Sequence, residues 1–288
     1  MTAAPGAAVV TTTEIKHEST LFAEPIGQLG GFPVTNALIT SVATVIVIVA
    51  FTTILRRRLR EIPSGIQNAF ETILEEALSL CDQVTGSRAI TAKVFPLAFS
   101  VFIFILINNW IGLLPLGGFG LLEKTSAGLS FVPFLRSGSA DLNTTLALAV
   151  MAVIGANVFG IFSVGTWKLF NKYINLKALG GILKKIRHEP SVLVIAPVEF
   201  FVGILELIGE FAKIASLSFR LFGNVFAGEV LLAAMSAIFA YALPVPFMFL
   251  EIFVGAIQAL IFAVLLLVYF TIAAQDHEGE SPETAHAH

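Results

Sequence analysis

The chain has 288 residues and a formal net charge of −3, and its composition is 56% hydrophobic but only 13% charged. That balance is too apolar for a water-soluble domain of this length, so it indicates an integral membrane protein. The single cysteine, Cys81, excludes an internal disulfide. Uncharged runs of about 20 residues or more, long enough to cross a bilayer as helices, lie at 34–55, 94–122, 142–167, 230–250 and 252–275.

Residues 1–33 are expected to form a polar N-terminal tail, because they lack the basic start and the apolar core of a signal peptide. The first membrane helix follows and ends at an arginine cluster between Arg56 and Arg60. Lysine and arginine accumulate on the cytoplasmic side of membrane proteins, which predicts a cytoplasmic position for this cluster and an external N-terminus. The same rule places the basic connection at 168–187 in the cytoplasm. Only Lys16, Lys124 and Arg136 are then left outside.

Residues from about 64 to 86 predict an amphipathic helix that does not cross the membrane. Apolar side chains recur there at helical spacing, whereas Glu71, Glu75 and Asp82 share another face. Helices on a lipid surface usually carry lysine and arginine on the polar face. The acidic face is therefore expected to meet either water or a basic partner, and the sequence favours neither.

Another membrane helix is expected from about 95 to 116. Near its end, Asn108 and Asn109 are expected to hydrogen-bond to other helices or to cap a helix end. A loop rich in glycine and serine follows at 117–140. Asp141 is expected to cap the N-terminus of the helix after it.

An apolar segment that begins at residue 191 carries five ionisable residues: Glu199, Glu206, Glu210, Lys213 and Arg220. On a helix these positions fall within a sector of roughly 80°, so they form a charged stripe on one face. Lys213 is directly adjacent only to Glu210, at i,i+3 spacing. Ionisable groups on a membrane helix are expected to line water or another protein, which makes the stripe a candidate functional site.

Arg220 is the most costly member of the stripe. A guanidinium cannot be deprotonated under protein conditions, so burial is not relieved by the loss of a proton. Placing it near a bilayer centre costs roughly 2.5–3.5 kcal/mol on insertion scales. Arg220 must therefore be functional or paired.

The segment at 191–223 would span about 48 Å as a helix, well beyond a hydrocarbon core of about 30 Å. The next stretch, 228–274, would be longer still, although Pro244 and Pro246 can bend or interrupt it. On an unbroken helix over this stretch, one face would carry Glu229, Glu251 and Gln258. The two elements are expected to form a long, strongly tilted hairpin at about 191–274 whose facing polar stripes make a path for ions.

Two other classes of membrane protein would use similar residues. A secondary transporter is expected to show internal repeats, and an intramembrane enzyme needs a nucleophile or a metal site. The sequence shows neither feature, nor a phosphate-binding loop, so the chain is not expected to bind ATP or a metal. The histidines near the C-terminus lie in a polar tail at 275–288 and lack metal-ligand spacing. Residues 34–274 are expected to form a single, all-α membrane domain with five or six membrane helices.

The residues at 216–229 read Ser-Leu-Ser-Phe-Arg-Leu-Phe-Gly-Asn-Val-Phe-Ala-Gly-Glu, and Gln258 follows in Ile-Gln-Ala-Leu-Ile-Phe. Together with Asp-Leu-Asn-Thr at 141–144 and Ile-Ala-Pro-Val-Glu at 195–199, these strings closely resemble subunit a of the F-type ATP synthase. The resemblance covers roughly residues 38–274. The chain departs from it at Glu251, where some relatives carry histidine.

The resemblance implies a stator subunit that is not catalytic and needs no cofactor. In this family two offset proton half-channels meet a rotating ring of c subunits, each of which bears one essential carboxylate. Arg220 matches the arginine that separates the half-channels. Glu206 matches the acidic position of the cytoplasmic half-channel, and Glu199 and Glu210 are weaker candidates on the same stripe.

Other members of the implied proton path lie near the arginine and toward the external side: Asn224, Glu229, Glu251, Gln258, Asp141 and Asn143. The implied partners are the c-subunit ring, the b subunits of the peripheral stalk, the lipid bilayer and, indirectly, the F1 sector, with no nucleic acid. The implied location is the bacterial plasma (inner) membrane.

Overall fold

The structure is a computed structural model of the chain, and it describes residues 21–59, 65–114, 120–125, 128–165, 192–239 and 242–275. The α-helices of this part are α1 (Asn36–Arg58), α2 (Ile66–Thr85), α3 (Arg88–Leu113), α4 (Leu142–Val164), α7 (Val192–Ile238) and α8 (Pro244–Gln275). The remaining elements are one short 3-10 helix, η2 (Gly138–Ala140), and the antiparallel hairpins β1 (Pro25–Leu29) with β2 (Phe32–Thr35) and β3 (Gly120–Thr125) with β4 (Gly128–Pro133).

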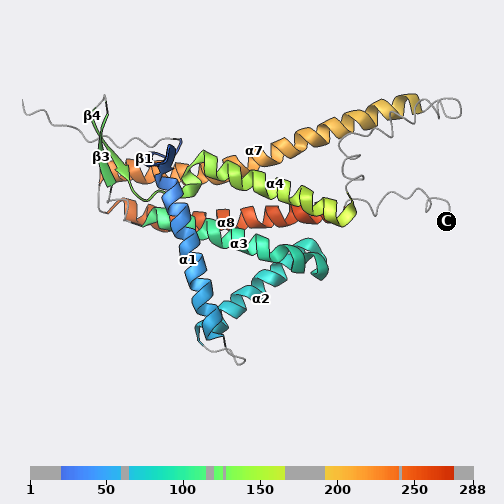
Figure 1. Ribbon diagram of the computed structural model, residues 1–288, viewed down its shortest axis with the longest axis horizontal. Helices are drawn as coiled ribbons and strands as arrows, with labels where there is room; N and C mark the ends of the chain where they lie inside the picture. Colours follow the sequence, from blue (N-terminus) through green and yellow to red (C-terminus); the bar gives the residue numbers. More distant parts are fainter. Residues whose placement is uncertain are drawn as a thin grey trace, which may run out of the picture.

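Four helices, α3, α4, α7 and α8, lie side by side and alternate in direction, and α1 crosses them steeply (Figure 1). α3 packs mainly on α8, and α4 packs on both α7 and α8. Their shared core contains the buried side chains of Ile105, Ala149, Leu217, Leu221 and Leu266. We call the end of this bundle where α3 and α7 end and α4 and α8 begin the loop end. The start of α1, β1 and η2 lie at the same end.

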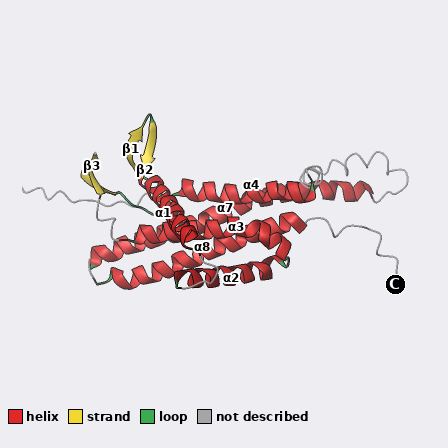
Figure 2. Cartoon of the chain, turned by 60° about the horizontal axis from the view of Figure 1, so that its bottom comes forward, coloured by secondary structure: helices red, strands yellow, loops and turns green. Residues whose placement is uncertain are grey.

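Five of the helices are long and apolar enough to cross a membrane. Their candidate spans are Asn36–Arg57, Arg88–Leu113, Leu142–Ser163, Phe201–Ile238 and Pro244–Ala274. This finding confirms the all-α membrane fold with five or six membrane helices. The remaining helix, α2, is shorter and amphipathic, and it folds back against α3 and α8, as seen in Figure 2.

The hairpin of α7 and α8 differs from the expected one in where it turns. α7 continues through Gly223 and Gly228 as a single helix of 47 residues that ends at Ile238, and α8 begins at Pro244. Pro244 is the first residue of α8, where its missing N–H leaves no helical hydrogen bond unmade. The unbroken helix on which Glu229 would share a face with Glu251 and Gln258 is therefore not formed. Glu229 lies on α7 with Arg220, because the division between the two helices falls just before the prolines.

The loops at the loop end contain more regular structure than the sequence indicated. β1 and β2 lie at the end of the stretch expected to be a polar tail, and Thr35 at the end of β2 caps α1 by accepting a hydrogen bond from the backbone N–H of Leu38. β3 and β4 lie within the expected Gly- and Ser-rich loop. The start of α4 is as predicted, because Asp141 accepts a hydrogen bond from the backbone N–H of Asn143 at 3.2 Å.

Candidate functional site

Arg220 lies near the middle of α7 and points away from the helix bundle. Its side chain is exposed, and so are Ser216, Asn224 and Ala227, which follow one face of the helix. Within the part of the chain that the structure describes, no carboxylate lies within 4.0 Å of the guanidinium; one nitrogen lies 3.5 Å from the hydroxyl of Ser216. The positive charge of Arg220 therefore lies on an outer surface of the protein. Among the described residues it has no counter-ion.

The orientation of Arg220 follows from how the other face of α7 is attached. Ser218 is 1% exposed, and its hydroxyl lies 3.2 Å from the hydroxyl of Thr145 on α4. Leu217 and Leu221 are buried in the core on either side of it. At 100° per residue, Ser218 and Arg220 point in nearly opposite directions. Burial of this face therefore turns the arginine outward.

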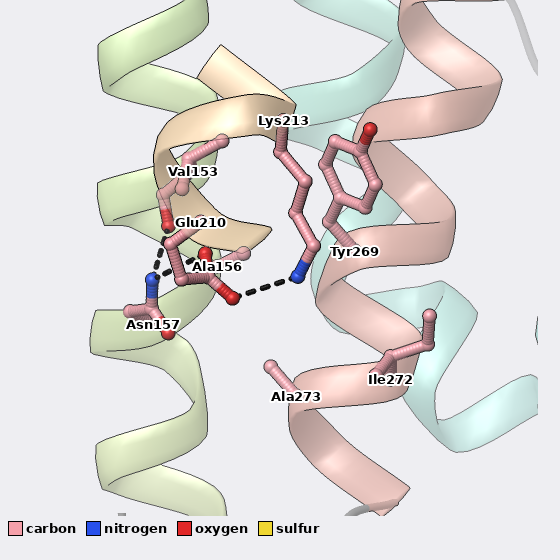
Figure 3. Close-up of a pocket in the computed structure, with 8 residues that line it drawn as sticks. All are labelled: Val153, Ala156, Asn157, Glu210, Lys213, Tyr269, Ile272 and Ala273. Carbon is pink, nitrogen blue, oxygen red and sulfur yellow. Dashed lines mark hydrogen bonds and ion pairs between the residues drawn. The ribbon is translucent and has the colours of Figure 1, made fainter. Parts of the chain in front are cut away.

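Toward the end opposite the loop end, α7 carries a closed ion pair. Lys213 donates a hydrogen bond of 2.7 Å to one oxygen of Glu210, and Asn157 on α4 donates one of 3.2 Å to the other (Figure 3). The Lys213 ammonium also lies 5.4 Å from the centre of the Tyr269 ring on α8. The predicted adjacency of Lys213 and Glu210 is confirmed. Both oxygens of Glu210 are thus occupied, one by Lys213 on α7 itself and the other by Asn157, which joins α7 to α4.

These groups line a small cavity between α4, α7 and α8, shown in Figure 3. Its volume of about 20 Å³ is enough for one water molecule. The cavity walls combine the Glu210, Lys213, Asn157 and Tyr269 side chains with apolar ones. Glu206, one turn before Glu210, is partly exposed and lies outside this lining. Glu199 lies on the first turns of α7, and its side chain is outside the described residues.

At the loop end, α7 carries a second ion pair. The Nε of Arg136 lies 3.0 Å from one oxygen of Glu229 and 3.1 Å from the other. The arginine side chain is 4% exposed and the glutamate side chain 24% exposed. Arg136 precedes η2, so this pair joins the segment between α3 and α4 to the last third of α7.

Polar contacts around this pair tie several elements together. Asn109 on α3 donates a hydrogen bond of 3.2 Å to the carbonyl of Gly255 on α8. Asn108 donates to Ser41 on α1 at 3.3 Å and accepts from the backbone N–H of Gly138 in η2 at 2.8 Å. These contacts confirm that the two asparagines hydrogen-bond between elements. Asp141 is buried and, besides capping α4, it accepts a hydrogen bond from the backbone of the segment before β1.

Glu251 lies on the second turn of α8 and is 9% exposed. Its carboxyl group lies against Gly228 on α7, so closely that a Cβ at Gly228 would overlap it. Within the described residues it makes no hydrogen bond or ion pair. A buried carboxyl group without a polar partner is costly in a membrane protein and is typical of a functional group.

The predicted residues thus fall into separate places. Glu251 on α8 lies against Gly228, the residue before Glu229 on α7. Gln258 lies two turns beyond Glu251 on α8 and is half-buried. Asn224 is exposed one turn after Arg220, and Asn143 is exposed in the first turn of α4.

Arg136 was missed as a site residue. In the sequence it is one of few basic residues between two apolar runs, and such a residue is usually read as a solvent-exposed loop charge. Its burial depends on the folding of the segment at 134–141 back onto α1 and α7. The one feature of the sequence that could have indicated a structural role for Arg136 is its position, five residues before the helix-capping Asp141.

Outside the membrane spans, the junction of α2 and α3 holds another charged contact. The hydroxyl of Thr91 and the guanidinium of Arg88 lower the pKa of Asp82 below its usual value. Burial, together with the charge of Asp82, raises the pKa of the Cys81 thiol. Among the described residues no group of histidine, cysteine and acidic side chains is arranged to hold a metal ion.

The fold crosses the membrane several times and carries ionisable side chains inside its spanning helices. These features are typical of one class, the membrane proteins that transport ions. A sequence model of one family in this class, described as ATP synthase A chain, matches residues 37–271. The chain therefore belongs to the ATP synthase A chain family, as the string at 216–229 indicated.

Individual relatives agree with this assignment. ATP synthase subunit a of Mycobacterium bovis is 31% identical over 249 residues, which cover 85% of this chain and 88% of the relative. The subunit a of Mycobacterium tuberculosis matches equally well. That of Gloeobacter violaceus is 31% identical over 252 residues, 87% of this chain and 89% of the relative. Together with the five candidate spans, these bacterial relatives identify a multi-pass protein of the bacterial inner membrane.

Proposed function

We propose that the chain is the proton-translocating stator subunit of an ATP synthase, and that it exchanges protons with a ring of carboxylate-bearing c subunits at Arg220. The observation that carries this proposal is the exposed guanidinium on the outer face of α7, with no carboxylate beside it in the described chain. A charge of this kind inside a spanning helix needs a partner, and a moving subunit supplies one that comes and goes.

In this proposal the arginine acts by electrostatics. A fixed cation stabilises the ionised form of a ring carboxylate that approaches it, which promotes release of the proton. The same positive charge repels a proton that would pass directly along α7. The contact must break at every step of the ring, so a tight bidentate pair would oppose rotation. Chemistry on ATP takes place elsewhere in the complex, and this subunit is not itself catalytic.

The polar groups on either side of Arg220 are assigned to two half-channels. On the cytoplasmic side we assign Glu206, with Glu199 and Glu210 as further members of the charged stripe. At the loop end we assign the external half-channel to Asp141, Asn143, Asn224, Glu229, Glu251 and Gln258. The buried carboxyl group of Glu251 and the polar cluster around Asp141 support a path that enters at the loop end.

The proposed partners follow from this role. The c ring is assigned to the outer face of α7, because a face that carries Arg220 and Asn224 in an apolar surround suits neither lipid nor water alone. The b subunits of the peripheral stalk hold the stator and connect it indirectly to F1. The acidic face of α2, on which Glu75 is exposed, is a candidate contact for a basic partner.

The test is Arg220→Ala in the complete ATP synthase, reconstituted into vesicles. We expect loss of both ATP-driven proton pumping and proton-driven ATP synthesis, although the complex still assembles, because the other cation on the described α7, Lys213, is held by Glu210. Arg57→Ala, which removes an exposed arginine at the end of α1, is the matched control and should leave pumping intact. Normal coupled activity of assembled Arg220→Ala would overturn the proposal.

A second variant, Glu206→Gln, tests the cytoplasmic half-channel while leaving Arg220 unchanged. We expect slower proton flux with coupling retained, since the loss of one relay carboxyl group slows entry but leaves the barrier at Arg220 in place. Proton flux is measured as fluorescence quenching in vesicles at matched amounts of complex. An unchanged rate would remove Glu206 from the path.

A further inference from the structure

The carboxylates of Glu229 and Glu251, both near the loop end, have different surroundings. Glu229 is held by the buried guanidinium of Arg136 through both of its oxygens, at 3.0 and 3.1 Å. Glu251 is more deeply buried, lies against Gly228, and makes no hydrogen bond or ion pair with any residue that the structure describes. One carboxylate therefore has a fixed counter-ion, and the other does not.

The counter-ion of Glu229 is itself fixed in place. The backbone N–H of Arg136 donates a hydrogen bond of 3.2 Å to the hydroxyl of Thr40 on α1. One guanidinium nitrogen donates a hydrogen bond of 3.1 Å to the backbone carbonyl of Phe22 in the segment before β1. These contacts join the arginine to two elements besides α7. Since its side chain is 4% exposed, the cation has no route to solvent without local unfolding.

A proton carrier must alternate between its neutral and its ionised form. If Glu229 took up a proton, the buried guanidinium of Arg136 would lose the negative charge that contacts its Nε through both oxygens, and arginine cannot respond by releasing its own proton. Glu251 has no such constraint, because no cation in the described chain depends on its charge.

We propose that Arg136 is a positioning residue that withdraws Glu229 from proton transfer and leaves Glu251 as the carboxyl group that carries the proton at the loop end. Glu251 takes one proton from the external water and passes it on toward the ring, and the Arg136 and Glu229 pair keeps its two opposite charges throughout. This inference rests on the proposed function and divides the roles of two residues assigned there to one half-channel.

The experiment compares variants of the complete complex in vesicles by ATP-driven proton pumping. We expect Arg136→Gln to lower pumping by roughly tenfold, because it leaves an uncompensated carboxylate beside the path. Adding Glu229→Gln to it should restore pumping to within about threefold of the unaltered complex, since the two changes act on one pair. Arg136→Lys, which keeps the cation, should also retain most of the pumping. Glu251→Gln should lower it by roughly 100-fold.

The inference is overturned if the assembled Arg136→Gln/Glu229→Gln complex pumps as slowly as Glu251→Gln, or if Glu251→Gln pumps normally. Arg136→Met/Glu229→Leu is a second neutral pair, and failure of both neutral pairs to assemble also counts against the inference, because a pair that only positions is replaceable by neutral groups. Arg220→Ala separates this inference from the function itself. If that variant pumps normally, the proposed function fails; if it is inactive while the double variant is also inactive, only the role of Arg136 fails.

Discussion

Gly228 is the residue on which the approach of α7 and α8 at the loop end depends. Both helices carry a carboxylate there, and the Glu251 side chain occupies the space that a side chain at Gly228 would fill. A glycine in a helix interior is destabilising by roughly 1 kcal/mol relative to alanine. That cost is offset here, because the absence of a Cβ is what allows a carboxyl group to be buried between two spanning helices.

Gly228→Ala is therefore expected to harm the protein despite its better helix propensity. The new Cβ must displace the Glu251 carboxyl group or push α8 away, at a cost of about 1–3 kcal/mol. We expect a lower unfolding temperature of the purified complex and slower proton pumping. Gly209→Ala is the matched control, because nothing lies within 4 Å of a Cβ at that position of α7. If both variants were as stable as the unaltered complex, the close approach at Gly228 would be disproved.

At the scale of elements, α1 is attached to the other helices mainly at its first turns. Many of its large apolar side chains are exposed, among them Ile46, Val49 and Ile54. Its buried polar groups, such as Asn36 and Thr40, lie at the loop end. Hydrogen bonds to η2 and the neighbouring segments therefore decide where α1 meets the bundle.

Asn108→Leu tests this attachment. The side chain of Asn108 bonds both the α1 hydroxyl of Ser41 and the backbone N–H of Gly138, which is buried. Leucine would leave that N–H without a partner, which costs roughly 1–3 kcal/mol. Asn68→Leu on α2, an exposed asparagine, should change the stability by no more than about 0.5 kcal/mol. The measurement is thermal unfolding of the detergent-solubilised complex, and equal melting temperatures for the two variants would contradict the expectation.

The elements also show what could be predicted from the sequence. α1, α3 and α4 were predicted because an uncharged run of bilayer length has few alternatives to a spanning helix. The division into stretches at 191–223 and 228–274 was misplaced, because α7 continues through both Gly223 and Gly228, which a membrane helix tolerates. The ion pair of Arg136 and Glu229 joins residues 93 positions apart. Local patterns carry no information on such a contact, so it could not be predicted without the fold.

For the whole molecule, the lengths of the last two helices set the geometry in the membrane. At 1.5 Å per residue, the 47 residues of α7 span about 70 Å and the 32 residues of α8 about 48 Å. Both exceed a hydrocarbon core of about 30 Å, so this hairpin must lie strongly tilted or extend beyond the bilayer. A strongly tilted α7 presents a long stretch of its outer face at one depth, and a ring of vertical helices meeting it there would contact the surface around Arg220.

Cysteine cross-linking tests the proposal that the outer face of α7 meets a ring of c subunits. Asn224 is exposed one turn after Arg220, whereas the next residue, Val225, is 7% exposed and faces the core. In a chain whose Cys81 has been replaced by serine, we expect Asn224→Cys to form a disulfide with a cysteine placed beside the essential carboxylate of the c subunit. Val225→Cys should not, because its side chain points roughly 100° away, into the bundle.

Cross-linking is read on denaturing gels after mild oxidation of membranes that contain the whole complex. ATP-driven pumping should stop when the Asn224→Cys link forms and return on reduction, since a covalent tie holds the ring in place. If Val225→Cys cross-linked as efficiently as Asn224→Cys, or if the linked complex still pumped, the ring would not meet the protein at this face.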